Sequence, residues 1–189
     1  MLKNSPNGYG LIAIVIHWLM AITIFSVFGL GLYMVELTYY DTWYKGSLDL
    51  HKSIGMTLFI VLLLRMVWRF VNVTPQSADN NASRFEKGLA HYGHIFLYIL
   101  MAVLMLSGYL ISTADGRAID VFGVVSIPAI PFSFENQEDI AGEIHEILAW
   151  ALIVLSAGHA LAALKHHFIN KNNTLVRMLK VLPSNKCLK

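Results

Sequence analysis

Long apolar stretches separated by short polar segments make up most of the chain from its eleventh residue onward. A helix needs roughly 20 mostly apolar residues to cross a hydrocarbon core of about 30 Å. Four stretches are long enough, and they predict transmembrane helices over residues 11–33, 51–71, 91–111 and 140–166. The first stretch is too long for a cleavable signal peptide. We therefore expect an all-α membrane protein, a four-transmembrane-helix bundle in which residues 1–189 form a single domain.

The composition agrees with this interpretation. Of the 189 residues, 56% are hydrophobic and only 14% are charged, which is too apolar for an ordinary soluble domain. The lone cysteine, Cys187, is too isolated for a disulfide framework, a zinc ribbon or a thiol active site. No Cys-x-x-Cys-His run occurs, so any haem in this chain must be held non-covalently. The expected surroundings are a lipid bilayer, with no nucleic-acid partner.

Basic residues are divided unevenly between the two sides of the expected bundle. With a cytoplasmic N-terminus, the inner side holds Lys3, Arg65, Arg69, Arg84, Lys87, Lys165, Lys171, Arg177, Lys180, Lys186 and Lys189. The outer side holds only Lys45, Lys52 and Arg117, whereas every acidic residue except Asp79 and Glu86 falls there. Because short cytoplasmic segments carry the excess of Lys and Arg, we predict an N-in/C-in orientation, with both termini cytoplasmic.

The connection between the third and fourth predicted helices, residues 113–139, is the longest in the chain. Pro128 and Pro131 argue against a continuous helix there. The segment is either a cap folded back over the outer surface or simply a long loop.

Four of the eight histidines stand at informative depths in the predicted helices. His145 and His159 are 14 residues apart, which is roughly 21 Å of helical rise on nearly the same face. His17 lies two turns inside the first helix and matches the depth of His159. His51 opens the second helix at the outer side and matches the depth of His145. The sequence therefore predicts two levels in the bundle, each with two histidines.

Two histidines at each level fit a haem iron better than other metals. A haem in an electron carrier takes two axial ligands from facing helices, and neutral imidazole supplies them. Zinc requires four ligands, or three and water, around one point. We therefore predict two haem b groups, one between His17 and His159 and the other between His51 and His145.

The same spacing of 14 residues recurs on the other helices. It relates His17 to Gly31, His51 to Arg65, and His94 to Gly108. A glycine at the level of a haem would leave room for the flat ring. Arg65 would reach the inner haem and bind its propionates, because a guanidinium suits carboxylates.

Each histidine also has an ordinary interpretation, as a hydrogen-bonded residue near a membrane interface. For a single one of the four predicted ligands this interpretation is as good as iron binding, but two depth-matched pairs are harder to explain in this way. The remaining histidines fall at the cytoplasmic boundary, where we favour the ordinary interpretation: His91, His94, His166 and His167. His94 is the exception to consider, as a partner of a propionate or a proton relay to a quinone.

Taken together, these residues resemble the bacterial cytochrome b561 family, small four-helix dihaem proteins of the inner membrane. The resemblance covers nearly the whole chain and rests on these segments: His17-Trp18, His51, the run from Gly88 to His94, Glu143-Ile144-His145-Glu146, His159, His166-His167 and Asn173-Thr174-Leu175. It implies that His17, His51, His145 and His159 are the haem ligands. It also implies a multi-pass protein of the bacterial inner membrane.

Family members are implied to exchange electrons with the quinone pool, and one type to oxidise superoxide at the outer face and reduce ubiquinone. The expected enzyme is thus a quinone-linked oxidoreductase. Its electron donor at the outer face is expected to be either a small molecule such as superoxide or a protein. The acidic outer side argues against long-range steering of an anion. Lys52 beside His51, with Lys45 and Arg117, would form a local positive entrance.

Two other functions remain open at this stage. The chain would serve as a haem-bearing membrane anchor subunit of a larger dehydrogenase if its acidic outer surface docks a partner. A metal or proton transporter is less favoured, because transporters of cations generally carry Asp or Glu within the spans. Here Glu36, Glu143 and Glu146 stand only at the ends of the predicted helices.

Overall fold

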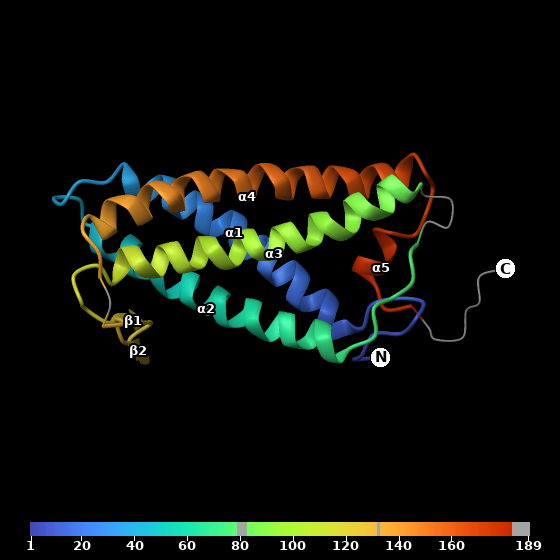
Figure 1. The fold of residues 1–189 in the computed structure, drawn as a ribbon, viewed down its shortest axis with the longest axis horizontal. Helices are drawn as coiled ribbons and strands as arrows, with labels where there is room; N and C mark the ends of the chain where they lie inside the picture. Colours follow the sequence, from blue (N-terminus) through green and yellow to red (C-terminus); the bar gives the residue numbers. More distant parts are fainter. Residues whose placement is uncertain (79–82, 132, 183–189) are drawn as a thin grey trace.

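The computed structural model contains four long helices that lie side by side in one elongated bundle (Figure 1). It describes residues 1–78, 83–131 and 133–182. The elements are α1 (Leu11–Val35), α2 (Tyr44–Val71), α3 (Arg84–Ser112), β1 (Ile119–Val121), β2 (Val125–Ile127), α4 (Gln137–Phe168) and α5 (Val176–Leu179). Cys187, Lys186, Lys189 and Asp79, used in the sequence analysis, lie outside the described residues.

Four helices of the described chain, α1 to α4, are long and apolar enough to cross a membrane. Large apolar side chains on their outward faces are exposed, among them Ile22, Val67 and Val154. So much exposed apolar surface would be unfavourable in water and is suited to lipid. The prediction of a helical membrane protein with four spans is confirmed.

Two of these helices begin seven residues before the expected start. α2 begins at Tyr44, so His51 lies two turns inside the helix and does not open it. α3 begins at Arg84, where Ser83 and Glu86 form a capping box. The Ser83 hydroxyl accepts from the backbone N–H of Glu86 at 3.2 Å, and the Glu86 carboxylate accepts from the backbone N–H of Ser83 at 3.0 Å. Hydropathy does not detect these first turns, because they are polar.

The helices pack as two antiparallel hairpins, α1 with α2 and α3 with α4, which meet mainly through α2 and α3. A core cluster fills the middle of the bundle with Met20, Leu58, Leu62 and Met105. Met101 packs against this cluster. The methionine-containing stretch of α3 is thus part of the core, where flexible thioether side chains fill irregular gaps.

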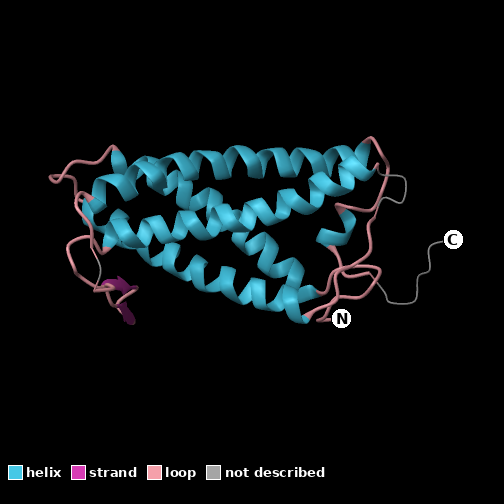
Figure 2. Ribbon diagram, in the orientation of Figure 1, coloured by secondary structure: helices cyan, strands magenta, loops and turns pink. Residues whose placement is uncertain are grey.

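The two ends of the bundle differ in what they carry (Figure 2). We call one end the hairpin end; it holds the α1–α2 connection and the described residues 113–131 and 133–136, which include β1 and β2. We call the other the terminal end; it holds the N-terminus and α5 (Figure 1). The indole N–H of Trp18 donates to the carbonyl of Met178 at 2.6 Å and joins α1 to the segment containing α5.

The α3–α4 connection contains a small antiparallel sheet. β1 pairs with β2 in the register Ile119 with Ile127 and Val121 with Val125. The turn between them has positive φ at Phe122 (53°) and Gly123 (70°). The tyrosine hydroxyl of Tyr109 fastens the following segment by donating to the carbonyl of Pro128 at 2.8 Å. The connection is therefore a folded structure and not simply a long loop.

Candidate haem-binding sites

The histidines at the hairpin end come from α2 and α4. The ring centroids of His51 and His145 lie 6.2 Å apart, and their planes make an angle of 67°. Because α2 begins two turns before His51, this couple lies inside the bundle. Both rings are more than half buried by the surrounding helices.

The histidines nearer the terminal end come from α1 and α4. The ring centroids of His17 and His159 lie 6.3 Å apart, with an interplanar angle of 75°. The structure thus brings together His17 with His159 and His51 with His145. Their assignment as iron ligands stays a prediction.

The spacing within each couple suits one iron atom between two imidazoles. Metal–nitrogen bonds of about 2 Å on opposite sides of an iron place the two ring centres roughly 6 Å apart. Both couples have this separation. The residues present therefore fit a haem at each level: His51 with His145, and His17 with His159, would hold the iron of a group that supplies one-electron redox chemistry when bound.

The ring of His145 is oriented by hydrogen bonds from α3. Its Nδ1 lies 3.0 Å from the carbonyl oxygen of Leu104 and 3.1 Å from the hydroxyl oxygen of Ser107. The Ser107 hydroxyl itself donates to the Leu104 carbonyl at 2.7 Å. Both oxygens therefore accept from Nδ1–H, which leaves the lone pair of Nε2 for a metal.

Two glycines make space for the imidazoles at the hairpin end. A Cβ on Gly108 would lie 3.0 Å from Cε1 of His145, and one on Gly31 would lie 3.3 Å from Cε1 of His51. From the sequence, we expected glycines at this level to leave room for a haem ring. In the structure, the side chains that pack against Gly31 and Gly108 are those of His51 and His145.

Arg65 makes a contact that the sequence did not predict. Its Nε donates to the hydroxyl of Tyr98 at 2.9 Å, and one terminal nitrogen lies 3.1 Å from Nδ1 of His17. A guanidinium only donates, so in this arrangement Nδ1 of His17 accepts and the ring hydrogen is on Nε2. Iron binding through Nε2 therefore requires Arg65 to release His17, which would free the guanidinium for a propionate.

His94 lies beside the couple at the terminal end. Its ring centroid is 5.0 Å from that of His159, and its Nδ1 is 2.5 Å from the carbonyl of Ala90. This separation is about 1 Å shorter than two axial ligands of one iron require. His17 is the better partner of His159 by this criterion. The remaining histidines, His91, His166 and His167, stand at the terminal end and belong to neither couple.

Comparison with known proteins decides the family. Residues 8–180 match the family model described as prokaryotic cytochrome b561. The chain is 47% identical over 176 residues to cytochrome b561 homolog 2 of Escherichia coli strain K12, covering 93% of each protein. The chain belongs to the prokaryotic cytochrome b561 family.

Two more distant relatives agree with this assignment. The chain is 29% identical to the probable superoxide oxidase CybB of Yersinia pestis over 90% of this chain and 95% of the relative. It is also 29% identical to cytochrome b561 homolog 1 of Escherichia coli strain K12, over 69% of this chain and 73% of the relative. The resemblance stated from the sequence is confirmed. As a cytochrome b561, the chain is a multi-pass membrane protein of a family that binds haem b and transfers electrons.

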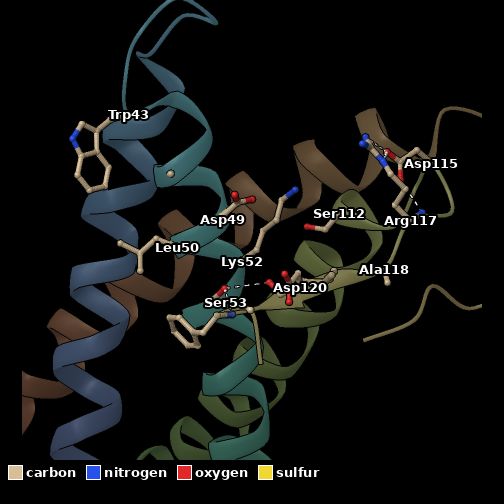
Figure 3. Close-up of a pocket in the computed structure, with 14 residues that line it drawn as sticks. Trp43, Asp49, Leu50, Lys52, Ser53, Ser112, Asp115, Arg117, Ala118 and Asp120 are labelled. Atoms are coloured by element: carbon tan, nitrogen blue, oxygen red, sulfur yellow. Dashed lines mark hydrogen bonds and ion pairs between the residues drawn. The ribbon is translucent and has the colours of Figure 1, made fainter. Parts of the chain in front are cut away.

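A cavity of about 610 Å³ opens at the hairpin end of this cytochrome b561, between the start of α2 and the segment that contains β1 (Figure 3). It is lined in part by Lys52 and Ser53, the two residues that follow His51. Its charged lining residues are Asp49, Lys52, Asp115, Arg117 and Asp120. Carboxylates thus outnumber cations on its walls.

The expected local positive entrance is therefore not what the structure shows. Arg117 is ion-paired with Asp115, and its Nε donates to that carboxylate at 2.6 Å. This hydrogen bond and the guanidinium charge hold the pKa of Asp115 below its usual value and raise the pKa of Arg117. Lys45 does not line the cavity. Among the described residues, Lys52 is the lining cation that takes part in no ion pair.

A second cavity, of about 390 Å³, opens at the terminal end. Its ionisable lining residues are Tyr9, Arg69, Lys87, His91 and His94, without a carboxylate among them. His94 thus borders this cavity on one side and His159 on the other. Arg69 comes from α2 and His91 and His94 from α3, so their convergence depends on how these helices pack, which the sequence did not predict.

Proposed function

We propose that this cytochrome carries two haem b groups and transfers electrons between a donor at the hairpin end and ubiquinone. His17 and His159 would ligate one iron, and His51 and His145 the other. The hairpin end would face the outside of the bacterial inner membrane and both termini the cytoplasm, in keeping with the distribution of basic residues. When bound, each haem supplies one-electron redox chemistry, and the protein supplies the ligands, the spacing and the access.

The observation that carries this proposal is the pair of imidazole couples at two depths. Their centroid separations, 6.2 and 6.3 Å, are nearly the same, although the two couples use different helices. His145 and His159 share α4 and are 14 residues apart, which corresponds to roughly 21 Å along the helix. Two redox groups at these levels would lie one after the other along the length of the bundle, from the hairpin end to the terminal end.

The donor is proposed to react at the hairpin end, where a cavity adjoins the residues next to His51. Superoxide is the candidate suggested by the name of the Yersinia pestis relative. The lining of this cavity offers an anion only Lys52 as a cation outside an ion pair, so electrostatic steering would be weak. A neutral small molecule or a protein with a basic surface suits these charges equally well.

Ubiquinone reduction is proposed to take place at the terminal end. Quinol formation takes up two electrons and two protons, so it needs proton donors close to the nearer redox centre. His94 borders the terminal cavity and lies 5.0 Å from His159, centroid to centroid. His91 lines the same cavity, and a positioned imidazole can pass a proton to a bound group.

Rapid mixing of the purified, reconstituted protein with superoxide tests this function. We expect the absorption spectrum to show that the haems become reduced on mixing with superoxide. When a soluble ubiquinone is also present, the haems should become oxidised again. Haems that stay oxidised with superoxide would remove it as a donor. Haems that stay reduced in the presence of ubiquinone would remove the acceptor.

The alternative is a haem-bearing membrane anchor subunit of a larger dehydrogenase. The excess of carboxylates at the hairpin end favours it, because an acidic surface can dock a basic partner. Purification in a mild detergent separates the two functions. A stable additional subunit would support the anchor, and turnover by the chain alone would count against it.

A metal transporter is not favoured, since no group of three His, Cys, Asp or Glu residues suited to a metal ion occurs within the described ranges.

A further inference from the structure

The hairpin formed by β1 and β2 is fastened to the side of α2 by one buried serine. The hydroxyl of Ser53 donates to the carbonyl of Asp120 at 3.3 Å and accepts from the backbone N–H of Phe122 at 3.1 Å. Ser53 is 3% exposed, and Ile119 at the start of β1 is 4% exposed. Figure 3 shows Ser53 and Asp120 facing each other across this contact. The backbone of β1 and of the turn residue Phe122 is thus fixed against α2.

The position of Ser53 sets the depth of the hairpin. Ser53 is the tenth residue of α2, which begins at Tyr44, so it lies about 14 Å along the helix axis from the first residue. The charged first turns of α2 end here, and a stretch without a charged residue runs from Ile54 to Leu64. The hairpin therefore lies beside α2, near the boundary of the hydrocarbon region, and does not stand above the end of the bundle (Figure 1).

The tip of this hairpin is apolar and exposed. Phe122, Val124 and Val125 are 55%, 82% and 57% exposed. Phe122 also holds a φ of 53°, in the left-handed region where Asn or Gly is usual at a hairpin turn. Phe122 and Gly123 border the cavity at the hairpin end, whereas Val124 and Val125 do not line it and would present apolar side chains to water. A lipid surface would account for both the type and the exposure of these two valines.

We propose that this tip, residues 121–125, is an interfacial anchor that inserts into the headgroup region of the bilayer beside α2. The partner is the lipid surface, because the tip lies beside α2, on which Ile60, two turns after Ser53 and on the same side of the helix, is also an exposed apolar residue. Apolar and aromatic side chains are favoured at this depth of a membrane. The anchor would hold β1, whose residues Ile119 and Asp120 line the cavity at the hairpin end.

Depth-dependent fluorescence quenching tests the proposal in the full-length protein. In a Cys187→Ser background, Val124→Cys provides a single labelling site on an exposed side chain, where a substitution leaves the packing intact. A matched control is Glu135→Cys, an exposed polar position in the same connection. Both proteins are labelled with an environment-sensitive fluorophore and reconstituted into phosphatidylcholine and phosphatidylglycerol vesicles.

We expect phosphatidylcholine spin-labelled near the headgroup to quench the Val124 label several-fold more than the Glu135 label, and iodide in water to show the opposite order. Equal quenching of both labels by iodide would overturn the proposal, because the tip would then be in water. Protection of the Val124 label from both quenchers would also overturn it, because a second copy of the chain would then cover the tip. The readout does not depend on haem content or on quinone, so it is independent of the proposed electron transfer.

Discussion

Nδ1 of His145 lies 3.0 Å from the carbonyl oxygen of Leu104 on the neighbouring helix. Leu104 stands one helical turn before Gly108, against which the same imidazole packs. The glycine thus admits the ring, and the carbonyl orients it. On α1, Val27 and Gly31 are related in the same way, and the buried Nδ1 of His51 lies near the Val27 carbonyl, outside hydrogen-bond geometry. The couple at the hairpin end is therefore supported by two similar surfaces, one from each helical hairpin.

Gly108→Ala is expected to disturb the couple at the hairpin end. The added Cβ would lie 3.0 Å from Cε1 and 3.3 Å from Nδ1 of His145, so the ring must move. We predict loss or an altered spectrum of one haem, while the other is unchanged. Gly31→Ala should act in the same direction but more weakly, because its closest approach to His51 is 3.3 Å. Absorption spectra at low temperature resolve the two haems.

Gly29→Ala is the matched control for these variants. Gly29 is two residues from Gly31 on the same helix, and a Cβ there would meet nothing within 4 Å. It removes a glycine from α1 without approaching an imidazole. If Gly29→Ala changed the haem spectrum as much as Gly31→Ala, helix propensity and not ring clearance would be the cause.

Arg65→Gln is expected to lower the reduction potential of the haem at the terminal end only. The guanidinium lies next to His17, and its positive charge would stabilise the reduced form of a nearby haem. Loss of one charge in a partly buried site is worth on the order of 1.4 kcal/mol, or about 60 mV for one electron. A spectroscopic redox titration measures both potentials.

Arg69→Gln provides the comparison for Arg65. Both guanidinium groups lie over the ring of Tyr98, at 5.7 Å for Arg65 and 5.6 Å for Arg69. Only Arg65 has a hydrogen-bond contact with His17. A smaller shift is therefore expected for Arg69→Gln. Equal shifts of both haems in either variant would show that the charge acts at long range and not on one site.

Ser53→Ala is expected to loosen the hairpin while the four-helix bundle stays folded. The change removes the acceptor for the N–H of Phe122 and the donor to the carbonyl of Asp120. Losing such buried hydrogen bonds costs about 1–3 kcal/mol, which would raise local opening by roughly 5- to 150-fold. Hydrogen exchange in residues 119–127 measures this. Ser26→Ala, whose hydroxyl bonds only to the carbonyl of Ile22 one turn earlier, should leave the exchange of these residues unchanged.

Asp115 is expected to titrate below an ordinary aspartate, because Arg117 donates to its ionised carboxylate. A lowered pKa in the folded state means that the ion pair contributes stability above the unfolded value of about 3.9. This contribution is lost as the pH falls through the folded value. Carbon NMR of labelled aspartate measures the midpoint, which should rise toward 3.9 in Arg117→Gln. An unchanged midpoint would show that the pair does not form in the reconstituted protein.

The sequence predicted the parts of this fold that depend on long-range hydropathy. Four apolar stretches identified α1 to α4, because a span through lipid has no alternative to an internally hydrogen-bonded helix. The hydropathy pattern placed the start of α3 seven residues too late, at residue 91. The spacing of Ser83 and Glu86 is a capping-box signal that would have located it. The hairpin was not predicted, since a Phe-Gly turn lacks the Asn-Gly or Asp-Gly signature.

The candidate sites were predictable to a similar extent. Helical rise alone places His145 and His159 at two depths. It also places Gly31 and Gly108 at the same depth as His51 and His145. The contacts of Arg65 with Tyr98 and His17 depend on how α1, α2 and α3 rotate against one another, which spacing within each helix does not determine. The approach of His94 to His159 depends in the same way on the packing of α3 against α4.

The haem content of histidine variants tests the central claim most directly. Pyridine haemochrome analysis of the purified wild-type protein should give two haems per chain. Each single change to alanine at His17, His51, His145 or His159 should leave one. The double variant within a couple, His17→Ala with His159→Ala, should also leave one haem, whereas His17→Ala with His51→Ala should leave none. A double variant across the couples that retains a haem, or one within a couple that loses both, would contradict the proposed pairing.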